Sequence, residues 1–200
     1  MKTVFLISIE NQNLAKTIVS LEENSTKVDK YILLVNNKTC DNNRNIVKSL
    51  SGSCCGNEAK TYEDQGYEIS IKDNFVTVQN NNAKLVNLMN YAKSNLIDND
   101  DIIFTATSGT VFDKQYVEKI LTKFKDQSVG LVYSDYLENG NPVYLQYIQP
   151  MLQSPIKVKE LAVRRSLLSE LIFKDNNFNF MMDLFNISII RHIPEEIYAA

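Results

Sequence analysis

The sequence predicts an α/β protein, a three-layer α/β/α sandwich with a mostly parallel central sheet. Short apolar runs rich in β-forming residues alternate with amphipathic segments as far as residue 136, which is typical of this class. The first two apolar runs are separated by about 20 residues, the length of a crossover between parallel strands. The chain has 200 residues, so we expect a single domain over 1–200 that buries its own core.

The first fifty residues are expected to form two strands and two helices. Val4–Ile9 is a continuous apolar run that suits a strand covered on both faces. A helix is predicted over 11–23, with apolar residues at helical spacing and an asparagine available as its cap. Tyr31–Val35 predicts the second strand, 36–43 a polar turn and 44–50 a short helix.

The middle of the chain continues this alternation after a small polar segment, 51–66, which we expect to be a loop. Its apolar runs predict strands at 67–71, 75–78, 102–104 and 129–133. Amphipathic spacing predicts helices at 82–96 and 113–125.

The last third of the chain changes character and begins with an Asn-Gly-Asn-Pro turn signal at 139–142. Further strands are predicted at 143–147, 158–163 and 187–193, and helices at 165–171 and 178–185. Ligands of parallel sheets bind beyond the carboxyl ends of the strands. The loops expected to carry function are therefore 8–13, 36–41, 79–82, 105–110 and 134–139.

Bulk composition argues against several functional classes. The net charge of −3 gives no electrostatic reason to expect a nucleic-acid partner, and no apolar run approaches the length of a membrane span. Cys40, Cys54 and Cys55 are an odd set with two adjacent members, which favours reduced thiols and a cytoplasmic location. The one histidine, His192, lies far from them in sequence, so a zinc site is not expected and a structural role is favoured.

Four segments carry a resemblance to a known family. A strand, a short polar loop and a helix open the chain, and 34–41 reads Leu-Val-Asn-Asn-Lys-Thr-Cys-Asp. The strand at 102–104 leads to the helix at 113–125, and an Arg-Arg-Ser sequence at 164–166 is followed by Met-Asp-Leu at 182–184 and Ile-Pro-Glu at 193–195. In this order they resemble the GT-A-type, family-2 glycosyltransferase domain across nearly the whole chain. The resemblance implies the nucleotide-diphospho-sugar transferase fold, with a nucleotide-binding part at 1–136 and an acceptor-side part at 137–200.

The same resemblance implies a set of side chains that bind a nucleotide-sugar donor. These are Ser8, Glu10, Asn36, Asp41, Ser108, Asp135, Arg164 and Arg165. Asn36 stands where the family usually places an aspartate against the base, and its amide can still hydrogen-bond a uracil edge. Asn36 and Asp41 could instead form a polar turn that bonds its own backbone. Arg164 and Arg165 could neutralise a diphosphate or form a solvated basic face.

The resemblance departs from the family at the metal motif. The family strand ends in Asp-x-Asp, whereas here Ala106 and Ser108 occupy the two acidic positions and no carboxylate lies between Asp101 and Asp113. We therefore assign no metal ligands, and whether a divalent cation such as Mn²⁺ or Mg²⁺ takes part is left open. Residues 105–110 could cradle phosphate with hydroxyls and backbone N–H groups, or form a capped loop without a ligand.

Asp183 falls where the family has its catalytic base, which deprotonates the acceptor hydroxyl. The alternative is that Asp183 is a carboxylate on the helix surface without a catalytic role.

Two functions follow from these observations. The first is an inverting transferase that moves a sugar from a nucleotide-sugar donor to an unknown acceptor hydroxyl. The second is a catalytically inactive domain of the same fold that serves as a binding or structural module in a larger assembly. The sequence does not specify the sugar, the acceptor or the oligomeric state.

Overall fold

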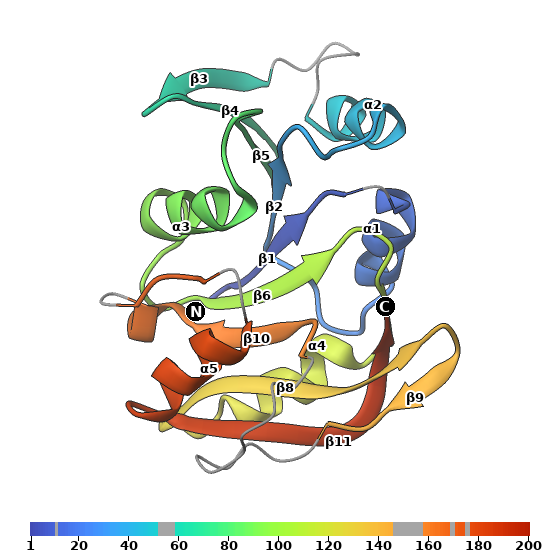
Figure 1. The fold of residues 1–200 in the computed structure, drawn as a ribbon, viewed down its shortest axis with the longest axis vertical. Helices are drawn as coiled ribbons and strands as arrows, with labels where there is room; N and C mark the ends of the chain where they lie inside the picture. The colour runs from blue at the N-terminus through green and yellow to red at the C-terminus, as the bar shows by residue number, and fades with distance from the viewer. Residues whose placement is uncertain (11, 52–58, 146–157, 169–170, 175–176) are drawn as a thin grey trace.

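The structure, a computed structural model, describes residues 1–10, 12–51, 59–145, 158–168, 171–174 and 177–200 (Figure 1). Cys54 and Cys55 lie outside these residues, together with parts of the loop predicted at 51–66, the strand predicted at 143–147 and the helix predicted at 165–171. Through the first 136 residues the order of the elements follows the prediction, apart from two strands that were not predicted, Lys60–Asp64 and Val111–Phe112.

The described residues form one mixed sheet of eleven strands. The strands are β1 (Thr3–Ser8), β2 (Lys30–Val35), β3 (Lys60–Asp64), β4 (Tyr67–Lys72), β5 (Phe75–Gln79), β6 (Ile102–Thr107), β7 (Val111–Phe112), β8 (Val129–Glu138), β9 (Asn141–Val143), β10 (Leu161–Arg164) and β11 (Ile189–Ala199). Their order is β3-β4-β5-β2-β1-β6-β10-β8-β11-β7, with β9 beside β8.

Four neighbouring strands, β5, β2, β1 and β6, are parallel, as the sequence predicts. The chain builds outward from β1 to β5 and then returns to β6 on the other side of β1. β10 enters antiparallel between β6 and β8, and the hairpin of β3 and β4 extends the opposite edge. The reversal of strand order beside β1 creates the crevice in which such folds bind ligands.

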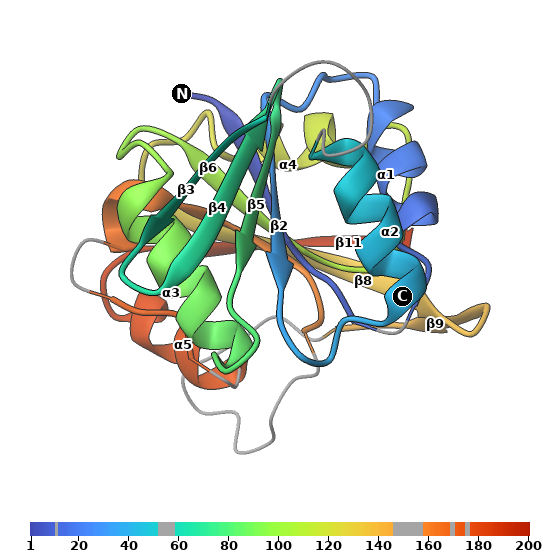
Figure 2. The ribbon, with the colours of Figure 1, turned by 90° about the horizontal axis from the view of Figure 1, so that it is seen from above.

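Helices cover both faces of this sheet. They are α1 (Leu14–Glu22), α2 (Asp41–Leu50), α3 (Leu85–Asn95), α4 (Tyr116–Lys123) and α5 (Asn177–Phe185), with the short 3-10 helix η1 (Arg165–Leu168) after β10. Figure 2 shows α1 and α2 on one side of the strands and α3 and α5 on the other, which is the predicted three-layer arrangement. None of the helices in the described ranges has the length and apolar character needed to cross a membrane.

An aromatic cluster forms the centre of the core under α4. The ring of Phe5 on β1 stacks on Phe104 of β6 with centroids 4.8 Å apart, and Phe112 meets it edge-on at 5.7 Å. Tyr116 closes the cluster from α4. Truncating a buried phenylalanine of this kind typically destabilises a protein by about 3–5 kcal/mol. The cluster therefore fixes β1 and β6 relative to each other, and with them the loops at their carboxyl ends.

Four parts of the strand pattern differ from the prediction. β3 lies within the segment expected to be a loop, because its side chains are mostly exposed and give no alternating signal. β7 has two residues, too few for a pattern. β8 continues through Ser134 and Asp135, which are polar but buried. β11 continues past Pro194, where shifts in its register with β8 accommodate the proline.

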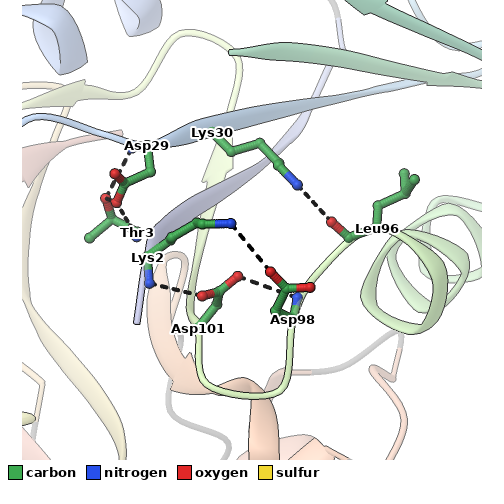
Figure 3. Close-up of polar contacts among 7 residues, drawn as sticks. All are labelled: Lys2, Thr3, Asp29, Lys30, Leu96, Asp98 and Asp101. Carbon is green, nitrogen blue, oxygen red and sulfur yellow. Dashed lines mark hydrogen bonds and ion pairs between the residues drawn. The ribbon is translucent and has the colours of Figure 1, made fainter.

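The amino ends of the central strands are joined by polar contacts (Figure 3). Asp101 accepts hydrogen bonds from the backbone N–H of Lys2 at 2.8 Å and of Asp98 at 3.3 Å. The carboxylate of Asp29 accepts from the N–H of Thr3 at 2.7 Å. These acids satisfy backbone donors at the end of the sheet opposite the carboxyl ends of the parallel strands. Asp101 therefore has a structural role at this end of the sheet.

Candidate functional site

A cleft of about 510 Å³ opens at the carboxyl ends of β1, β2 and β5. Its wall consists of Ser8, Ile9 and Glu10 after β1, Asn36, Asn37 and Lys38 after β2, and Asn82, Ala83, Lys84 and Leu85 at the start of α3. Three loops predicted to carry function therefore meet in one place. Among the residues predicted to bind a donor, Ser8, Glu10 and Asn36 line this cleft. Lys84, which the sequence analysis did not single out, adds a cation.

A buried asparagine on α2 holds the backbone of the β1–α1 loop. The side-chain amide of Asn43 on α2 donates to the carbonyl oxygens of Glu10 at 2.8 Å and Gln12 at 2.6 Å, and its Oδ1 accepts from the N–H of Leu14 at 3.2 Å. Asn43 is fully buried. It therefore fixes the loop whose first residues line the cleft, although nothing in an asparagine-rich sequence distinguishes it from its neighbours.

The turn after β2 is built around Asn36. Its Oδ1 accepts from the N–H of Lys38 at 2.9 Å, and its N–H donates to Oγ1 of Thr39 at 3.3 Å. Thr39 in turn donates to the carbonyl of Ile9 at 2.8 Å, and Arg44 donates to the carbonyl of Asn36 at 2.7 Å. Asn36 thus forms the self-bonded polar turn and lines the cleft at the same time. No partner for its Nδ2 group is found among the described residues.

The β6–β7 turn closes against the β1–α1 loop. Ser108 is buried; its N–H donates to the carbonyl of Ser8 at 2.9 Å, and its Oγ accepts from the N–H of Glu10 at 3.0 Å. Gly109 has φ +98°, and a Cβ at this position would lie 2.6 Å from Cβ of Gln12. A glycine is therefore required here by conformation and by close approach. Ser108 holds the donor-side loops together and does not face the cleft.

Glu160 is the main residue that sequence reasoning missed. It is 2% exposed, precedes β10, and accepts hydrogen bonds from the N–H of Thr107 at 2.8 Å and from the hydroxyls of Thr105 and Thr110 at 3.1 and 3.2 Å. Burial raises the pKa of the Glu160 carboxyl to about 7, and these hydrogen bonds partly oppose the rise. A titratable carboxyl therefore lies beneath the β6–β7 turn.

Asp135 is paired with a histidine, which the sequence did not suggest. Its Oδ1 lies 2.7 Å from Nε2 of His192 and accepts from the N–H of Leu145 at 2.7 Å. The His192 ring stacks on Tyr133 with centroids 4.9 Å apart, and both members of the pair are nearly buried. The pair joins β8, β11 and Leu145, two residues after β9. Asp135 does not line the cleft at β1, β2 and β5.

The other predicted residues lie at the margin of the cleft or away from it. Asp41 is exposed in the first turn of α2, directly after the turn that contains Asn36. Asp183 lies on α5, 35% exposed, and forms an ion pair with Lys174. Neither lines the cleft of 510 Å³.

Arg164 and Arg165 lie at the opposite end of the sheet from the cleft. Arg164 pairs in register with Ile102, the first residue of β6, and its guanidinium donates to the carbonyl of Val129 at 2.8 Å. Arg165 donates to the carbonyl of Lys93 at 2.8 Å, and burial lowers its pKa. Both guanidinium groups bind backbone carbonyls, so the structure does not bring them to a diphosphate in the cleft.

The residues at the end of β6 do not fit a cation held by an acidic pair. The stretch from Ile102 to Phe112 has no carboxylate, and in the described part of the chain no group of three or more His, Cys, Asp or Glu side chains could hold a metal ion. Glu160, the acid nearest this turn in the fold, binds hydroxyls and a backbone N–H.

No protein-family model matches the sequence, and no curated protein sequence matches it. The fold is similar to that of TarS from S. aureus. A crystal structure of TarS residues 1–349 aligns with a TM-score of 0.69 and 13% identity over 100% of this chain and 60% of that chain. The same fragment in complex with UDP-GlcNAc aligns with a TM-score of 0.66 and 12% identity over 58% of that chain. Another structure of TarS aligns with a TM-score of 0.64 and 11% identity over 36% of that chain.

This chain thus spans about 60% of the TarS fragment. At 13% identity, the similarity shows that the fold is shared and nothing more. The shared architecture is an α/β fold with a mixed, mostly parallel central sheet. It agrees with the resemblance found in the sequence. The chain therefore has the GT-A-like fold of nucleotide-sugar transferases.

Proposed function

We propose that the chain binds a nucleotide sugar in the cleft between β1, β2 and β5 and transfers the sugar, with inversion, to an acceptor hydroxyl. The observation that carries this proposal is the cleft itself: about 510 Å³ of space beside the strand where the sheet order reverses. Its volume suits a small organic ligand. The proposal includes the family-2 type of reaction and a cytoplasmic location.

The donor would lie with its base against the turn after β2. Asn36 keeps an amide N–H group for a base carbonyl, and Lys38 and Lys84 supply positive charge at the cleft wall. Ser8 offers a hydroxyl, and Asp41 a carboxylate at the margin. TarS has been crystallised with UDP and with UDP-GlcNAc, which makes uridine nucleotides the first ligands to test. Residues 1–136 would bind the donor, and 137–200 would complete the acceptor side.

A thermal-shift titration tests donor binding. A nucleotide sugar at one hundred times its Kd should stabilise the chain by about 2.7 kcal/mol, which for a chain of this size raises Tm by roughly 5–10 °C. The panel should contain UDP-, GDP- and dTDP-sugars, each with and without Mn²⁺. Asn36→Ala should remove most of the shift, whereas Asn45→Ala, an exposed substitution on α2, should not. Absence of a shift with every nucleotide contradicts the proposal.

Asp183 is the proposed catalytic base. Replacement by asparagine removes proton abstraction and should lower turnover by about 10²–10⁴-fold while donor binding is kept. Lys174→Ala provides the matched control, because it removes the ion-pair partner of Asp183 and leaves the carboxylate in place. Turnover of Asp183→Asn equal to that of the parent chain would exclude the base role.

A second function has its own support. The turn after β6 has no acidic pair, and stabilisation of charge on a leaving diphosphate is a large part of such catalysis. We therefore keep, as the alternative, a catalytically inactive domain that binds a ligand or partner within a larger assembly. Nucleotide binding without release of nucleoside diphosphate from any donor would favour this alternative.

A further inference from the structure

Glu160 connects two elements that are far apart in sequence. Its carboxylate, just before Leu161 of β10, accepts from Thr105 and Thr107 at the end of β6 and from Thr110 after the following turn. One oxygen, Oε1, binds Thr107 N–H and the Thr110 hydroxyl, so it bridges the two sides of the turn. A single buried side chain therefore bridges the two sides of the turn.

Contacts of the same turn continue to the cleft. The hydroxyl of Ser8, which lines the cleft, donates to the carbonyl of Ala106 at 3.1 Å and lies 3.5 Å from Oγ1 of Thr107. The next residue, Ser108, binds the backbone of Ser8 and Glu10. Hydrogen bonds thus lead from the Glu160 carboxylate through Thr107 to a cleft residue.

The surroundings of Glu160 leave its charge without an ionic partner. The titratable groups that face it are Tyr116 from α4 and Tyr198 from β11; burial raises both of their pKa values, so both stay neutral. β6 and the β6–β7 turn contribute only neutral donors. The neighbouring Lys159 forms its ion pair with Glu138. No ion pair between described residues includes Glu160, so the balance between its charged and neutral forms responds to other charges nearby.

We propose that Glu160 is a positioning residue of the donor site and that it takes up a proton when a nucleoside diphosphate group binds in the cleft, an inference that rests on the proposed function. The negative charges of a diphosphate beside Ser8 disfavour a second, buried negative charge at Glu160. The proton comes from solvent. Once protonated, the carboxyl can still accept from the Thr107 N–H and can donate to a threonine hydroxyl, so the turn stays fastened.

Coupling of this kind is reciprocal, so the pH must change the affinity for the donor. UDP-GlcNAc is the suitable probe, because its diphosphate is esterified at both ends and does not titrate between pH 6 and 8. A rise of about one unit in the pKa of Glu160 on binding makes the affinity about fivefold tighter at pH 6 than at pH 8. Calorimetry in buffers of different ionisation enthalpy should register net proton uptake near pH 7.5.

Glu160→Gln is a neutral substitution of the same shape. We expect its Kd for UDP-GlcNAc to agree at pH 6 and pH 8 within about twofold, and its proton uptake to vanish. A purely structural role predicts weaker binding by the same factor at both pH values and an unchanged pH profile; that result overturns the inference while the proposed function stands. If neither protein binds UDP-GlcNAc or any other sugar nucleotide of the UDP, GDP and dTDP panel at any pH, the proposed function and the inference both fail.

Thr110→Val keeps the test decisive if the glutamine variant does not fold. It removes one hydrogen-bond donor from the ionised carboxylate and leaves the carboxyl itself in place. The loss of affinity with rising pH should then begin at a higher pH than in the parent chain. A pH profile that does not move contradicts the coupling.

Discussion

Glu160 should also make the stability of the ligand-free chain depend on pH. Its pKa is about 7 in the folded state against an ordinary value of 4.5, so the folded chain holds this proton more tightly than the unfolded chain. The stabilisation is present below the unfolded value and is lost as the pH rises through about 7. The difference of about 2.5 units, at about 1.4 kcal/mol each, amounts to roughly 3 kcal/mol. Most of this stabilisation is lost between pH 5 and pH 8.

Glu160→Gln has no such proton to lose. Its free energy of unfolding, measured by urea denaturation and circular dichroism, should therefore rise relative to the parent chain by about 2–3 kcal/mol between pH 5 and pH 8. Glu63→Gln, an exposed substitution on β3, is the matched control and should show a constant difference. A constant difference for Glu160→Gln as well would refute the assignment of a raised pKa to this carboxyl.

Two further predictions concern the loops around the cleft. Asn43→Ala leaves two carbonyls and one N–H without their partner and should lower stability by about 3 kcal/mol, or Tm by roughly 6–12 °C in a thermal melt, whereas the exposed neighbour substitution Asn42→Ala should change stability by less than about 0.5 kcal/mol. Gly109→Ala should be more destabilising than Gly140→Ala, because both glycines have positive φ but only the Cβ at 109 meets another atom within 4 Å. Equal losses of stability for the two glycine variants would show that the close approach of the turn to the β1–α1 loop is unimportant.

The central strands could be predicted because they are buried, and buried strands consist almost entirely of apolar residues. β1 and β2 are apolar along almost their whole length and are covered on both faces, so a continuous hydrophobic run marks each one. The parallel order followed from the helices between them. The loops at the carboxyl ends of these strands could then be named as functional candidates, and three of them do meet at the cleft.

Other strands are defined by their partners and not by their own residues. β3 is mostly exposed and exists because it pairs with β4. Ser134 and Asp135 resemble a loop in sequence, yet they are buried because β8 lies inside the sheet. Pro194 normally ends a strand, and a bulged register with β8 allows β11 to continue. No local pattern contains this information.

The residues of the site also divide into those that local sequence identifies and those that distant contacts define. Asn36 could be identified from its place after an apolar strand, whereas Glu160 could not, because its role depends on contacts with residues 50 to 55 positions away in sequence. The one available signal was an acid directly before the apolar run of β10. The family resemblance implied that Arg164 and Arg165 bind the donor. Because β10 runs antiparallel to β6, it places them beside the amino end of β6.

The antiparallel insertion of β10 has a consequence for how the molecule folds. During synthesis, β5, β2, β1 and β6 can pair as soon as they emerge, since each crossover is short. β6 then remains an open edge until residues 161–164 arrive, and an unpaired edge flanked by Ile103 and Phe104 invites association between nascent chains. Insertion of β10 also requires contacts over a long stretch of chain, which slows folding. The late strand that carries Glu160 to the site is therefore also the strand that shields the growing sheet from aggregation.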